Sequence, residues 1–141
     1  MQHKVDNDDP LAHIPLFAHL SQADRDAVRS LMTDVRIEGG QVLTKEGAVG
    51  KEFFVILSGT AKVERGGAHL ADIGPGDFQG EISLLDGGPR MATVTATSPM
   101  ELLVATHQEF TSLLDRAPMI GRQMLPALAH RVRAAAEDHR H

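Results

Sequence analysis

The chain has 141 residues, 42% of them hydrophobic and 23% charged, which is typical of one folded globular domain and excludes a disordered chain. The net charge of −5 argues against nonspecific nucleic-acid binding, and the lack of cysteine excludes disulfides, thiol chemistry and Cys-ligated zinc. No apolar run approaches the roughly 20 residues that cross a bilayer, and the N-terminus is polar, so we expect a cytoplasmic protein without membrane insertion.

Residues 1–34 are expected to form a polar tail followed by helices. A short apolar segment, IPLFAHL, precedes Ser21, and Asp24 follows Ser21 at the spacing of a helix N-terminus. Apolar residues then recur at helical spacing, which predicts a helix over about residues 22–33.

Residues 35–106 consist of short β-rich runs separated by glycine and proline. Gly66 and Gly67 lie between AKVER and AHLADI, a pattern that predicts a two-residue hairpin turn. Several short strands at close spacing favour an antiparallel β-roll or jelly-roll barrel.

Residues 107–141 are expected to be helical again. Thr106 with Glu109 forms a capping-box pattern, and Pro118 suits the first turn of a following helix. Pro126 lies inside that helix, where its missing N–H predicts a bend. The apolar stripe of this helix comprises Ile120, Met124, Leu125, Leu128, Val132 and Ala136. The whole chain therefore reads as a single domain over residues 1–141, mainly β with flanking helices.

The stretch GDFQGEISLLDGGPRMATV, residues 76–94, contains the candidate functional site. EISLL could form one or two helical turns, whose free N–H groups attract an anion. Gly80 lets a ligand approach the backbone, and the guanidinium of Arg90 matches a phosphate bidentately. Glu81 would repel a phosphate but can accept a hydrogen bond from a sugar hydroxyl, so these residues together predict a nucleotide site.

This stretch resembles the phosphate-binding cassette of the cyclic nucleotide-binding domain family. The resemblance rests on G-D-x-x-G-E-I-S-L-L followed by P-R-x-A-T-V, with Glu81 nine positions before Arg90. It extends over roughly residues 14–136 and implies a β-roll flanked by helices, including a short cassette helix.

The resemblance also implies ligand contacts at matching positions. Arg90 would pair with the cyclic phosphate, and Glu81 would bind the ribose 2′-OH. Main-chain groups would come from Gly80, Ile82, Ser83, Met91 and Ala92. Because Met91 stands where relatives that favour cyclic GMP often carry threonine, we expect cyclic AMP as the ligand, with cyclic GMP the less favoured alternative.

Apolar residues of the roll are candidates for the wall near the base, namely Val63, Leu70 and Ile73. One departure from the family pattern is Gln79, which stands where many relatives have an aromatic or apolar residue.

Two other functions are weighed against a cyclic nucleotide sensor. A degenerate roll that binds no nucleotide would serve as a protein-interaction module. A small metal enzyme would need an H-x-H pair on the barrel strands, but only His69 lies there. Ser83 lacks a G-x-S-x-G context, so no catalytic residue and no cofactor is expected. With no output domain recognisable in the sequence, the expected receiver of the signal is a second copy, an effector protein in trans, or a portion of the protein outside this chain.

Overall fold

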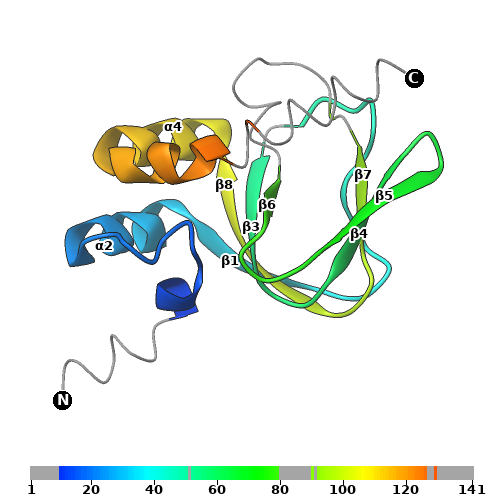
Figure 1. Cartoon of the computed structure of the whole chain (residues 1–141), viewed down its shortest axis with the longest axis horizontal. Helices are drawn as coiled ribbons and strands as arrows, with labels where there is room; N and C mark the ends of the chain where they lie inside the picture. Colours follow the sequence, from blue (N-terminus) through cyan, green and yellow to red (C-terminus); the bar gives the residue numbers. More distant parts are fainter. Residues whose placement is uncertain (1–9, 51, 80–89, 91, 127–128, 130–141) are drawn as a thin grey trace.

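A computed structural model describes residues 10–50, 52–79, 90, 92–126 and 129 (Figure 1). Helices α2 (Gln22–Leu31) and α4 (His107–Arg116), the helical segment 118–126 and the 3-10 turn η1 (Pro10–His13) cover one side of a pair of antiparallel sheets. The predicted cassette helix at EISLL lies outside the described residues.

Each sheet contains four strands. The first sheet has the order β1-β8-β3-β6 and the second the order β2-β7-β4-β5, and every pair of neighbours is antiparallel. The strands are β1 (Thr33–Ile37), β2 (Val42–Thr44), β3 (Glu52–Ser58), β4 (Ala61–Arg65), β5 (Ala68–Ile73), β6 (Phe78–Gln79), β7 (Thr93–Ala96) and β8 (Met100–Thr106). The sequence prediction of an antiparallel roll with flanking helices is therefore confirmed.

Two hydrophobic clusters hold these layers together. The inner cluster joins the two sheets and consists of Phe54, Ile56, Ala61, Val63, Val94, Ala96, Met100, Leu102 and Val104. The outer cluster joins the first sheet to the helices, and its largest fully buried members include Phe17, Phe53, Phe110, Leu113 and Ile120. The first sheet is thus covered on both faces, which explains the continuous apolar runs FFVI and LLVA.

Strand β3 shows how one strand serves both clusters. Successive side chains point to opposite faces, so Phe53 and Val55 enter the outer cluster while Phe54 and Ile56 enter the inner one. The ring of Phe53 stacks on Phe110 of the C-terminal helix with centroids 4.5 Å apart. This contact fixes the helix against the sheet.

The helices begin at the residues that the sequence indicates. Helix α2 (Gln22–Leu31) is capped by Ser21, whose Oγ accepts the N–H of Asp24 at 3.1 Å. Helix α4 (His107–Arg116) begins with a complete capping box. Residues 118–126 form a further helical segment, in agreement with the role given to Pro118.

Two details differ from the sequence predictions. Helix α2 ends at Leu31 rather than near residue 33, because Thr33 already pairs with Val104 in the sheet. Leu125 is 61% exposed, so it does not belong to the buried stripe formed by Ile120 and Met124. The bend predicted at Pro126 stays a prediction, because the chain is described as helical up to Pro126 but residues 127 and 128 lie outside what the structure describes, as do the stripe residues Val132 and Ala136.

The predicted hairpin between β4 and β5 is confirmed. Gly66 and Gly67 have φ values of 58° and 81°, the left-handed backbone that a two-residue turn requires. The N–H of Gly66 donates to the Oε1 of Glu46 at 2.9 Å, so the tip of this hairpin is tied to the loop that follows β2.

Candidate functional site

Arg90 is the predicted site residue that the structure places most clearly. Its backbone pairs with the loop between β2 and β3: Arg90 N–H donates to the carbonyl of Ala48 at 2.8 Å, and Gly47 N–H donates to the carbonyl of Arg90 at 2.9 Å. This pair of bonds resembles one rung of an antiparallel ladder. It holds Arg90 at the end of the roll where β3 begins.

The guanidinium of Arg90 is buried, with 6% of the residue exposed. Its Nη2 donates to the main-chain oxygen of Glu52, and its Cζ lies 5.7 Å from the ring centroid of Phe54. Nη1 is buried and has no hydrogen-bond partner among the described residues. A buried guanidinium therefore keeps a donor available for a ligand.

The charge of this group is only partly compensated. Burial lowers the pKa of Arg90, and the negative charge of Glu52 opposes that shift. Among the residues that the structure describes, no carboxylate forms an ion pair with Arg90. Because an uncompensated buried cation is unfavourable, an anionic ligand at Nη1 would relieve that cost.

Hydroxyl groups fix the chain on the C-terminal side of Arg90. The Oγ1 of Thr44 donates to the carbonyl of Ala92 at 3.1 Å, and the N–H of Glu46 donates to the Oγ1 of Thr93 at 3.0 Å. Thr44 is itself buried, and Ala92 packs against the inner cluster. The site thus rests on β2 and β7, two strands about 50 residues apart in the sequence, and not on a free loop.

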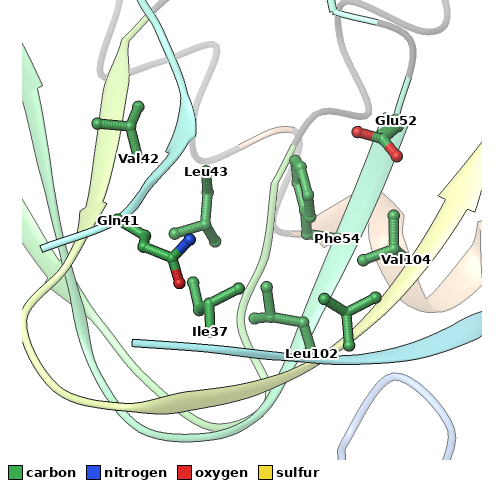
Figure 2. A pocket seen from close by; sticks show the side chains of 9 residues that line it. Ile37, Gln41, Val42, Leu43, Glu52, Phe54, Leu102 and Val104 are labelled. Atoms are coloured by element: carbon green, nitrogen blue, oxygen red, sulfur yellow. The ribbon is translucent and has the colours of Figure 1, made fainter. Parts of the chain in front are cut away.

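A cavity of about 220 Å³ lies inside the roll beside this group. Its side chains come from β1, β2, β3 and β8 and from the turn before β2, and Figure 2 shows Glu52 and Phe54 at one end. Its wall is mostly aliphatic and is formed by Val35, Ile37, Gln41, Val42, Leu43, Glu52, Phe54, Leu102 and Val104. Glu52 and Phe54 therefore contact both Arg90 and the interior of the roll.

The remaining predicted site residues divide into two groups. Ala92, two positions after Arg90, is described and is half-buried. Outside the described residues lie Gly80, Glu81, Ile82, Ser83 and Met91, and their contacts stay predictions.

The place expected for Val63, Leu70 and Ile73 near the base stays a prediction, because none of them is among the described residues that line this cavity. Val63 is buried in the inner cluster and Ile73 packs against it, whereas Leu70 is 46% exposed and does not enter the roll interior. Strand β5 has an exposed burial pattern over most of its length, which the apolar character of Leu70 alone did not indicate.

Sequence reasoning missed three residues beside Arg90, namely Gly50, Glu52 and Phe54. Phe54 supplies the aromatic ring beside the guanidinium, Glu52 supplies the main-chain acceptor of Nη2, and Gly50 supplies bare backbone beneath the group. All three precede Arg90 by more than 30 positions, and only the pairing of distant segments brings them together. The alternation of Phe53 and Phe54 could have identified which ring faces inward, but not what it meets.

In the described part of the chain, no group of three or more histidine, aspartate or glutamate side chains is arranged to hold a metal ion. None of the described helices is both long and apolar enough to cross a membrane.

The family model for the cyclic nucleotide-binding domain matches residues 34–117. The cyclic AMP receptor protein of Thermus thermophilus is 32% identical over 126 residues, covering 86% of this chain and 58% of the relative. The cAMP-dependent protein kinase regulatory subunit of Eremothecium gossypii is 36% identical over 108 residues, covering 76% of this chain and 24% of the relative.

Solved structures agree with these sequence matches. The crystal structure of the Thermus thermophilus catabolite activator protein superposes with a TM-score of 0.78 at 31% identity, covering 88% of this chain and 61% of that one. The chain therefore spans less than two thirds of the length of the proteins it matches here.

Proposed function

Because this chain belongs to the cyclic nucleotide-binding domain family, we propose that it is a sensor module that binds cyclic AMP in preference to cyclic GMP and relays occupancy through its C-terminal helix. The match to the family covers more than half of the chain and includes both Arg90 and the strands that hold it. The relatives named above are a receptor and a regulatory subunit, which supports a regulatory and non-enzymatic role.

The observation that carries this proposal is the buried cation at position 90. The guanidinium has one amine committed to the Glu52 carbonyl, whereas Nη1 is unpartnered among the described residues. A cyclic phosphate carries one negative charge and supplies oxygens that accept charge-assisted hydrogen bonds. The cyclic phosphate would compensate the positive charge of the guanidinium, which burial has removed from water.

The other contacts follow from the family resemblance. Glu81 would accept the ribose 2′-OH, which an ionised carboxylate can do because it only accepts hydrogen bonds. Main-chain groups for the phosphate would come from Gly80, Ile82, Ser83, Met91 and Ala92. Methionine at position 91 offers no hydroxyl to the guanine amino group, which favours cyclic AMP.

The relay would use the helix that begins at Pro118. Ile120 and Met124 anchor residues 118–126 in the outer cluster, beside α4 and the sheet. Nucleotide binding would reorient the chain beyond Pro126, where the helix loses a backbone donor, so that Leu128 or Val132 covers the purine. The receiver of this signal would be a second copy, an effector protein in trans, or a further part of the same polypeptide, in the cytoplasm.

Calorimetric titration with cyclic AMP and cyclic GMP tests the proposal. The wild type should bind both, with cyclic AMP the tighter. Arg90→Met should weaken binding by about a hundredfold or more, because the phosphate loses its buried partner. Its thermal midpoint should stay the same or rise, because a poorly compensated buried charge has been removed.

Arg116→Met is the matched control, since Arg116 is an exposed arginine in the last turn of α4. It should bind like the wild type. A folded wild type that binds neither nucleotide would refute the sensor and leave the roll as a protein-interaction module. Unchanged affinity in Arg90→Met would refute the assigned site.

A further inference from the structure

We infer that Gly50 is a positioning residue for the nucleotide: its missing side chain creates the space in which the Arg90 guanidinium is held. The effect on nucleotide affinity rests on the proposed function, whereas the effect on Arg90 itself does not. Gly50 lies in the loop before β3, 40 positions from Arg90, and no motif in the sequence connects the two residues.

The guanidinium of Arg90 occupies the space where a side chain at position 50 would lie. A Cβ built on Gly50 would overlap Nε, Cζ and Nη2 of Arg90, and these are its three nearest neighbours. Nothing else in the described structure is as close to that position. The planar guanidinium therefore lies against the bare Cα of Gly50, an approach that only glycine permits.

The backbone gives no other reason for glycine at this position. Gly50 is absent from the residues with positive φ, so its conformation is open to alanine. Gly47 in the same loop is the opposite case, because its φ is +82° and nothing lies within 4 Å of an added Cβ. Glycine at position 47 thus permits the left-handed turn of the chain, whereas glycine at position 50 permits the close approach of Arg90.

Three groups from one short segment fix the guanidinium. Gly50 supplies a surface, Glu52 accepts from Nη2 through its main-chain oxygen, and Phe54 places its ring 5.7 Å from Cζ. Gly50, Glu52 and Phe54 therefore determine where Nη1 lies, the nitrogen that has no partner among the described residues. A methyl group at position 50 would push the guanidinium off this platform and move Nη1 away from the phosphate.

The consequence is a loss of affinity without a loss of fold. A displacement of about 1 Å can reduce the strength of a positioned contact by orders of magnitude, so Gly50→Ala should weaken cyclic AMP binding by about tenfold or more. The loss should act through Arg90 alone. In the Arg90→Met background, Gly50→Ala should therefore change affinity by less than about twofold.

Gly39→Ala is the matched control. Gly39 also lacks a positive φ, and a Cβ there would meet only backbone atoms of Ser98 at 3.6–3.7 Å, an ordinary van der Waals contact. Both variants replace glycine by alanine in a permitted conformation, so both should keep the thermal midpoint of the wild type within about 3 °C. Only Gly50→Ala should affect Arg90.

The experiment combines two readouts on the full chain. The first is the ¹H–¹⁵N signal of the Arg90 Nε–H without nucleotide, assigned by its disappearance in Arg90→Met. In the wild type and Gly39→Ala, this proton should exchange with water about tenfold more slowly than that of exposed Arg116. In Gly50→Ala the signal should shift and its exchange should accelerate. The second readout is calorimetric titration with cyclic AMP.

The outcomes separate the two claims. An unchanged Arg90 signal in Gly50→Ala overturns the positioning role, whether or not any nucleotide binds. A displaced signal with wild-type affinity overturns its importance for binding. If the wild type binds no cyclic nucleotide, the proposed function fails, while the arginine signal still supports or overturns the placement of Arg90 by Gly50.

Discussion

Arg90 is a buried arginine, and three contacts with residues that are distant in the sequence hold it in place. The loop after β2 pairs with its backbone, Phe54 flanks its guanidinium, and Glu52 accepts from Nη2. Burial lowers the pKa of Arg90, but an arginine remains protonated at any accessible pH. The residue therefore keeps a positive charge in a place that disfavours it, which is the physical basis for the proposed binding of an anion.

In the proposed site, the residue at position 91 would set the preference between the two bases. Met91→Thr should raise affinity for cyclic GMP relative to cyclic AMP by about threefold to tenfold, because a hydroxyl can accept a hydrogen bond from the guanine amino group. Met91→Val is the matched control, since valine has the shape of threonine without the hydroxyl. Competition binding with both nucleotides measures the ratio. A ratio that changes equally in both variants would contradict a role for the hydroxyl.

Helix α4 is the element that connects the roll to the helical layer. Phe110 and Leu113 are buried in the outer cluster, and the stacked pair Phe53–Phe110 joins α4 to β3. The helix begins directly after β8, where the Oγ1 of Thr106 accepts the N–H of Glu109 at 3.2 Å and Glu109 accepts the N–H of Thr106 at 2.9 Å. The capping box thus sets the point at which strand becomes helix.

Loss of this cap should destabilise the domain. Thr106→Ala should reduce the free energy of unfolding by about 1 kcal/mol, because the first turn of α4 loses a side-chain acceptor. Thr111→Ala is the control, since Thr111 lies within the same helix and donates only to the His107 carbonyl. Urea denaturation measures both. Equal losses in the two variants would show that the cap is not the stabilising feature.

At the scale of the whole molecule, the two hydrophobic clusters share the first sheet. Side chains that face inward from β3 and β8 reach the cavity and Phe54, and those that face outward reach α4 and residues 118–126. A change at the site can therefore act on the helical layer through a single sheet. The buried residues Ile120 and Met124 make the start of the last helix part of that layer.

Hydrogen exchange tests whether the last helix responds to the ligand. Saturating cyclic AMP should slow amide exchange over residues 118–136, because the helix would be held over the base. Amides of α2, which contributes no side chain to the cavity wall, should change little and serve as the internal reference. Equal protection of residues 118–136 with and without nucleotide would contradict the relay.

Local sequence patterns were enough to predict the class of fold and the family. Three features depend on residues within four positions of one another: the hairpin turn at Gly66–Gly67, the cap of α2 and the capping box of α4. They can therefore be predicted from the sequence alone. The predicted end of α2 was wrong by two residues, because Thr33 pairs with Val104, a residue that is distant in the sequence.

The cassette motif identified Arg90 because its chemistry lies in one continuous stretch, residues 76–94. Only the tertiary structure decided what surrounds that arginine. Strand pairing brings Gly50, Glu52 and Phe54 to it from about 40 positions away, and a contact across that separation depends on the register of the sheets. The sequence by itself thus determined which charge is proposed for the ligand, and the packing of distant strands determined where that charge is held.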